Sequence, residues 1–182
     1  MNPPKPRNPR SQPPRLLPNE PLPPYTFVPG RTPHPHSDPQ GHAFGLPPEP
    51  PEMLDDVRWR ECGPYLRGLD LFNHGYCWEA HEVWEGLWNT AGRRGPLADF
   101  LKGLIKLAAA GVKARAGQPE GVRHHARRAA QLFHEVGSAR FCGLDLDELT
   151  AAALQIAEQP PAVGADEPLG APVLPLVLTP SE

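Results

Sequence analysis

The residues with the clearest capacity for chemistry lie between positions 76 and 88, in the stretch YCWEAHEVWEGLW. This stretch contains His81, Glu82 and Glu85, and side chains four residues apart lie on the same face of a helix. An imidazole nitrogen from His81 and a carboxylate oxygen from Glu85 form a donor pair typical of zinc, manganese and iron sites. We therefore predict a divalent-metal site at His81 and Glu85, with Glu82 and Glu85 as candidate catalytic carboxylates.

The same spacing has other interpretations. In the metalloprotease motif His-Glu-x-x-His the second ligand is histidine, whereas Glu85 takes that place here. On a helical wheel, Glu82 points about 100° away from His81, which argues against a metalloprotease base at Glu82. Two alternatives stay open: His81 and Glu85 form hydrogen bonds that only hold the fold, or they act as an acid–base or ligand-binding pair without a metal.

Other polar and aromatic side chains are candidates for a ligand pocket around this pair. They are Tyr76, Glu79, Trp84, Trp88 and His125. His125 falls among the apolar positions of a later helix. An imidazole there needs a hydrogen-bond partner, because an unpaired buried polar group costs about 1–3 kcal/mol.

Three more histidines precede the predicted core. His34, His36 and His42 lie within nine residues, and short histidine-rich tracts are one type of metal-binding sequence. The apolar residues at 25–28 predict that this segment docks on the helices, where one of these histidines would complete the metal's ligand shell. The alternative is a segment that wraps the core without a catalytic role.

The elements that must position these side chains are helices. Helical patterns of apolar residues span 52–61, 65–72, 77–89, 97–116, 119–136 and 146–159, the first of them short. The core has no alternating strand pattern. We predict an all-α fold, a compact bundle of four to five helices, with the His81 helix lining a pocket at its centre.

Proline placement divides the chain into four parts. Residues 1–51 hold 18 of the 27 prolines and residues 52–159 hold three, and proline is excluded from helix interiors. We predict a disordered Pro/Arg-rich arm at 1–24, an extended Pro/His-rich docking segment at 25–51, a helical domain at 52–159 and an irregular Pro-rich tail at 160–182.

Charge is distributed in blocks, although the net charge is only −3. Residues 93–128 carry nine basic and two acidic side chains. The basic side chains of this block either pair with acidic helices of the same protein or form a surface that binds an acidic partner or nucleic acid. Within it, Lys102, Lys106 and Lys113 share one side of a helix, where a solvated face is the simpler interpretation and anion binding the alternative.

Segments for export or membrane insertion are not evident. No run approaches the roughly 18 apolar residues of a membrane span, and no apolar run follows the basic start. The three cysteines, Cys62, Cys77 and Cys142, fit neither a disulfide framework nor a zinc motif. We expect a cytoplasmic protein without a membrane partner. Its oligomeric state, a homo-oligomer included, stays open.

Two blocks of residues resemble a known family. The first is Leu71-Phe72-Asn73-x-Gly75-Tyr76-x-x-Glu79-Ala80-His81-Glu82-x-Trp84-Glu85-x-x-Trp88, and the second is Phe100-Leu101-x-Gly103-Leu104-Ile105-Lys106-Leu107-Ala108 with Gly117 and Gly121-Val122. Over about residues 64–135 they resemble the bacterial and archaeal family called domain of unknown function 309. The resemblance implies a small all-α fold with the His81 helix at its centre, and no established activity.

Two functions therefore compete. In the first, a divalent metal held by His81 and Glu85 has an open coordination position and supports hydrolysis. In the second, the protein is a non-catalytic interaction module that uses the basic surface of residues 93–128.

Overall fold

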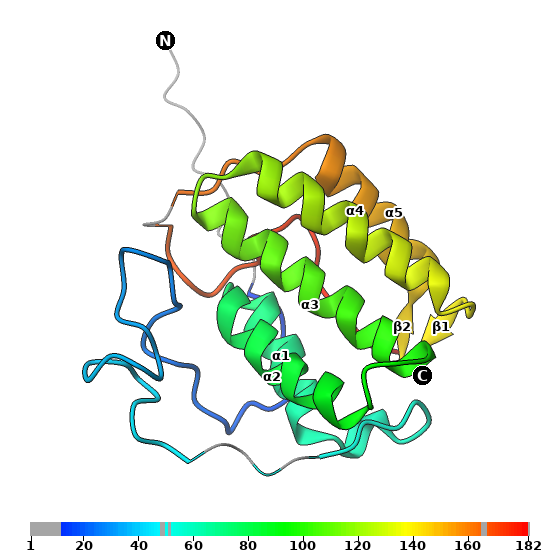
Figure 1. The fold of residues 1–182 in the computed structure, drawn as a ribbon, viewed down its shortest axis with the longest axis horizontal. Helices are drawn as coiled ribbons and strands as arrows, with labels where there is room; N and C mark the ends of the chain where they lie inside the picture. The colour runs from blue at the N-terminus through cyan, green and yellow to red at the C-terminus, as the bar shows by residue number, and fades with distance from the viewer. Residues whose placement is uncertain (1–11, 48–49, 51, 165–166, 182) are drawn as a thin grey trace.

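The described residues of this computed structural model are 12–47, 50, 52–164 and 167–181, and they form a bundle of five α-helices (Figure 1). The helices are α1 (Gly63–Asn73), α2 (Cys77–Thr90), α3 (Pro96–Arg115), α4 (Pro119–Glu135) and α5 (Leu146–Glu158). Each helix packs against the next one along the chain, so α3 lies between α2 and α4. The predicted all-α bundle is confirmed.

Proline and glycine set several helix boundaries. Pro96 and Pro119 occupy first turns, where the missing N–H has no helical partner to lose. Gly75 and Gly117 follow α1 and α3 with φ of 89° and 66°, a backbone conformation that side chains with a Cβ disfavour. At the start of α5, the carboxylate of Asp145 accepts a hydrogen bond from the backbone N–H of Glu148, as its capping position predicts.

The prediction of a helix over residues 52–61 is wrong. Only a single 3₁₀ turn, η1 (Trp59–Glu61), forms there. The Asp55 carboxylate accepts hydrogen bonds from the backbone N–H groups of Val57 and Arg58. This local turn gives the backbone an alternative to helical hydrogen bonds.

A small antiparallel hairpin joins α4 to α5 and was not expected from the sequence. Its strands are β1 (Arg140–Phe141) and β2 (Leu144–Asp145). The two turn residues, Cys142 and Gly143, have φ of 47° and 77°, as a type I′ turn requires. Cysteine is unusual at the first of these positions, so the turn lacks the Asn-Gly signal that predicts such hairpins.

Large aromatic side chains fill the centre of the bundle. Trp84 and Phe133 are fully buried. A Cβ added at Gly68 would lie 2.1 Å from the Trp84 Nε1 atom, and one added at Gly103 would lie 2.4 Å from the Phe133 ring. Both glycines therefore let an aromatic ring lie directly on a neighbouring helix backbone.

The segments outside the bundle are attached to it by polar side chains. Asp70 is fully buried and accepts hydrogen bonds from Arg15 Nε and from the backbone N–H groups of Leu16 and Leu17. These contacts differ from the disordered arm predicted at 1–24, of which residues 1–11 lie outside the described part.

The C-terminal tail also lies on the bundle. The Asn73 amide donates to the Leu178 carbonyl and accepts from its N–H, at 2.9 and 2.8 Å. Val173, Leu174 and Leu178 are buried.

None of the helices in the described part of the chain has the length and hydropathy of a membrane span.

Candidate metal centre

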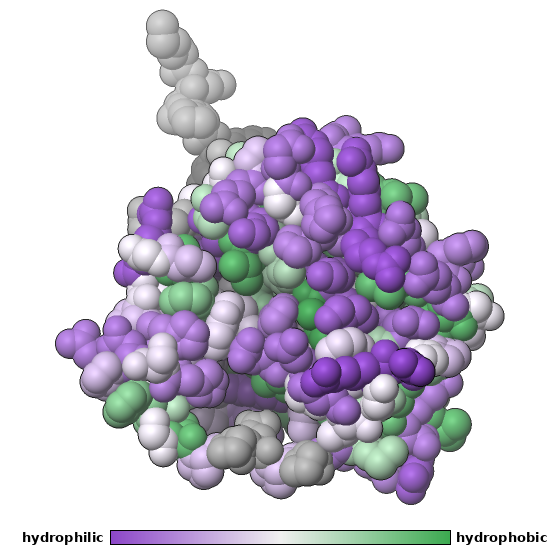
Figure 2. Space-filling model, in the orientation of Figure 1, coloured by the Kyte–Doolittle hydropathy of each residue, from purple (hydrophilic) through white to green (hydrophobic). Residues whose placement is uncertain are grey.

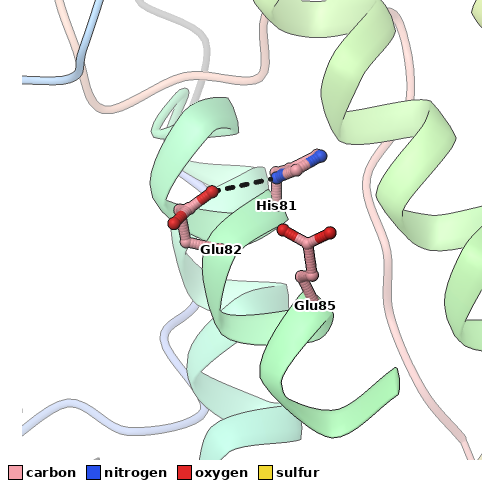
Figure 3. A group of neighbouring side chains, drawn as sticks. All are labelled: His81, Glu82 and Glu85. Atoms are coloured by element: carbon pink, nitrogen blue, oxygen red, sulfur yellow. Dashed lines mark hydrogen bonds and ion pairs between the residues drawn. The ribbon is translucent and has the colours of Figure 1, made fainter. Parts of the chain in front are cut away.

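His81, Glu82 and Glu85 form a cluster on α2, in which both carboxylates are directed toward the imidazole (Figure 3). One ligand atom of each residue lies within 4.8 Å of the others. Nδ1 of His81 lies 3.3 Å from Oε1 of Glu82. The exposed fractions of these two side chains, 28% and 39%, leave the cluster accessible to an ion from solvent. It is the one such group of three histidine, cysteine or acidic residues among the described residues.

The expectation that Glu82 turns away from His81 is wrong. A helical wheel gives the direction of the Cα–Cβ bond, and these directions do differ by about 100° for neighbouring residues. The glutamate side chain has three rotatable bonds, however, and the Glu82 carboxylate reaches back to the imidazole. Both glutamates therefore belong to the cluster, and on the helical wheel both lie on the same side of His81, Glu85 at about 40° and Glu82 at about 100°.

Glu79 was predicted to line a ligand pocket, but it anchors the N-terminal segment. Its carboxylate is buried and accepts hydrogen bonds from Thr26 Oγ1 at 2.7 Å and from the Phe27 N–H at 2.8 Å. His42 Nε2 lies 3.4 Å from the same carboxylate. These contacts, together with its burial, give the Glu79 carboxylate a structural role in holding the segment on α2.

Tyr76 and Trp84, two further residues of the predicted pocket, belong to the core. Both are buried, and burial raises the pKa of the Tyr76 hydroxyl. The Trp84 ring packs against Phe72 and over Gly68. Because both side chains are buried, neither presents a surface to which a ligand from solvent could bind.

Trp88 lies at the edge of the cluster, under two cations. Lys102 Nζ is 3.8 Å and Arg93 Cζ is 5.1 Å from the centroid of its ring. Burial lowers the pKa of Lys102, the charge of Lys106 lowers it further, and the carboxylate of Glu85 acts in the opposite direction. Lys102 thus lies within electrostatic range of Glu85 in the His81 cluster.

His125 lies on α4 and interacts electrostatically with the cluster from across α3. Burial is the main cause that lowers its pKa to about 4, and Lys106 is the next, with smaller effects from His124, Lys113 and His81. The imidazole is therefore neutral at pH 7. Its Nδ1 atom is buried and has no hydrogen-bond partner among the described residues.

The three N-terminal histidines lie outside the His81 cluster. The rings of His34 and His36 contact Trp78, with centroids 5.3 and 6.0 Å away, and His42 contacts Glu79. His36 does line a groove of about 480 Å³ that Glu82 also lines. The predicted docking of this segment thus brings histidines to α2 without adding one to the cluster.

Cysteine takes no part in the candidate centre. Cys62, Cys77 and Cys142 are buried and free. Burial raises the pKa of all three thiols, that of Cys77 to about 12. They are protonated at neutral pH, whereas metal binding requires thiolates.

Sequence reasoning missed Asp70, which fixes residues 15–17 to α1. The available signal was an acidic residue inside the apolar run from Leu69 to Phe72, because a carboxylate at a core position must have partners. Its partners lie more than 50 residues away in the sequence.

Comparison with known proteins shows similarity to one family, whose description gives no activity. None of the curated proteins compared with the chain matches it. Residues 65–125 match the family described as Domain of unknown function (DUF309). This span runs from α1 to the first half of α4 and includes the whole His81 cluster and His125. The similarity of this chain to DUF309 therefore covers residues 65–125 of its helical core.

Proposed function

We propose that the protein binds a divalent transition-metal ion through His81, Glu82 and Glu85. The observation that supports this most strongly is the convergence of one imidazole nitrogen and two carboxylate oxygens within 4.8 Å of one another. Bond lengths to zinc are about 2.0–2.2 Å for nitrogen and oxygen ligands. Rotation of the two flexible glutamate side chains is enough to close the remaining distance around one ion.

The charges of the cluster also favour a cation. Two carboxylates lie beside one imidazole on a single helix, and an ion of charge +2 would neutralise them. The nitrogen and oxygen donor set suits zinc, manganese or iron(II). Three protein ligands leave at least one coordination position open, as in catalytic sites, so the hydrolysis predicted from the sequence depends on this ion.

The test is metal content and affinity. The untagged protein is loaded with zinc or manganese, dialysed, and analysed by inductively coupled plasma mass spectrometry. We expect one ion per chain in the wild type and a loss of at least tenfold in affinity for His81→Ala and Glu85→Gln. His134→Ala, at an exposed position on α4 outside the cluster, is the matched control. A wild-type protein without bound metal, or a His81→Ala variant with unchanged affinity, would contradict the proposal.

The alternative function, an interaction surface made by residues 93–128, has weaker support. Several of its basic side chains are already engaged within the protein. Arg115 is buried, Arg123 pairs with Glu120, and Arg128 pairs with Glu135. The basic block therefore does not present all its charge to one partner.

A further inference from the structure

We infer that Lys102 and Lys106 of α3, together with His125 of α4, form a binding site for a phosphate-bearing ligand beside the His81 cluster. The inference rests on the proposed metal function, because one end of the ligand would contact the metal ion. The lysines and His125 would hold the other end.

The arrangement of three helices brings these groups together. α3 packs between α2 and α4 (Figure 1), so its side chains can reach groups on both neighbours: Lys102 interacts with Glu85 of α2, and Lys106 with His125 of α4. Lys102 and Lys106 are one helical turn apart on α3, and both are half-buried. Figure 2, in the same orientation, shows hydrophilic side chains gathered over the region of α3 and α4.

Neither of the two ammonium groups forms an ion pair with another described residue. Among the described residues, neither lysine has a carboxylate within ion-pair distance or a hydrogen-bond acceptor; Lys102 Nζ lies over the Trp88 ring, and the Glu85 carboxylate acts on it from a longer distance. Like charges four residues apart on a helix repel each other, and partial burial adds a desolvation cost. An anion that contacts both would remove the repulsion and supply the missing acceptors.

His125 supplies a third group. Its buried Nδ1 has no partner among the described residues, and burial, followed by the positive charge of Lys106, lowers its pKa and keeps the ring neutral. His124 on its own helix and His81 on α2 act in the same direction. A neutral imidazole has one N–H, which a phosphate oxygen can accept.

A phosphate group fits this charge pattern better than a carboxylate. Two lysines require two negative charges, and a phosphate monoester or diphosphate supplies them in one compact group. Lysine binds phosphate as a point charge, and divalent metals commonly bind the same ligands. The phosphate could belong to a small molecule or to a nucleic acid, and the experiment separates these sources.

The experiment uses the full chain, with and without bound zinc, at low ionic strength. Inorganic phosphate, pyrophosphate and a ten-nucleotide single strand are titrated separately by calorimetry. The His125 ring is followed by NMR. We expect pyrophosphate binding to weaken at least tenfold in Lys102→Met and in Lys106→Met, and to be unchanged in Arg127→Met, an exposed position on α4. Bound phosphate should raise the pKa of His125, which is about 4 in the free protein.

The outcomes are distinct. Tight, strongly salt-dependent binding of the oligonucleotide with weak pyrophosphate binding would assign the phosphate site to nucleic acid. Absence of binding by all three probes, or binding unaffected by both lysine substitutions, would overturn the inference. Metal content measured on the same samples separates the two proposals. A chain that binds pyrophosphate through the lysines but holds no metal would support the anion site and refute the metal function.

Discussion

Replacement of Glu79 by glutamine should release the N-terminal segment from α2. The carboxylate accepts from Thr26 Oγ1 at 2.7 Å and from the Phe27 N–H at 2.8 Å, and it is buried. Glutamine keeps one acceptor oxygen and places an NH₂ group against the other donor. The Thr26 hydroxyl can rotate and accept, but a backbone N–H cannot.

The magnitude follows from these two contacts. Hydrogen bonds to a charged group contribute about 1.5–3 kcal/mol each, and neutral ones about 0.5–1.5 kcal/mol. In Glu79→Gln both hydrogen bonds become neutral, and one of them loses its favourable geometry. Together these changes should reduce the free energy that holds the segment on α2 by about 2–4 kcal/mol. The donors belong to the segment, so the loss should appear first as local opening of residues around 25–42 and only partly as global unfolding.

Amide hydrogen exchange at Phe27 is the direct assay, with urea unfolding in parallel. We expect Phe27 exchange in Glu79→Gln to accelerate by roughly 30-fold or more, from about 2 kcal/mol at 1.4 kcal/mol per factor of ten. Glu85→Gln in metal-free protein is the control on the same helix and should leave Phe27 unchanged. Unchanged Phe27 exchange in Glu79→Gln would refute the anchoring role and return Glu79 to the candidate ligand residues.

Two further predictions concern the core and the response to pH. Gly68→Ala should destabilise the fold by about 1–3 kcal/mol in urea unfolding, because the new Cβ would overlap Trp84, whereas Gly86→Ala, with open space around it, should be neutral or stabilising. The pKa of His125 is about 4 in the folded protein and 6.5 in an unperturbed histidine, so the unfolded chain binds a proton first as pH falls. Stability should therefore decrease from pH 6.5 to pH 4, and His125→Leu should reduce this decrease; an identical pH dependence in that variant would contradict the assignment.

The helices were predictable where local signals agree with packing. For α3 and α4, proline at the first turn and glycine beyond α3 place the bounds within one residue of the predicted ones. The helix prediction for residues 52–61 was wrong because the Asp55 carboxylate accepts hydrogen bonds from the backbone N–H groups of Val57 and Arg58. These bonds stabilise a turn in place of the helix that the apolar periodicity indicated.

The candidate centre was predictable only in part. The spacing of His81 and Glu85 on one helix face follows from helical geometry, and the cluster contains both. The position of the Glu82 carboxylate depends on side-chain torsions, which a helical wheel omits. The roles of Asp70 and Glu79 depend on backbone donors more than 50 residues away, and no local pattern encodes such partners.

X-ray absorption at the zinc edge of the loaded protein tests the metal centre most directly. We predict a first shell of nitrogen and oxygen atoms at about 2.0–2.2 Å, with the scattering signature of one imidazole that disappears in His81→Ala. Sulfur ligands near 2.3 Å, or an imidazole signature that persists in His81→Ala, would contradict the assignment of the ion to His81, Glu82 and Glu85.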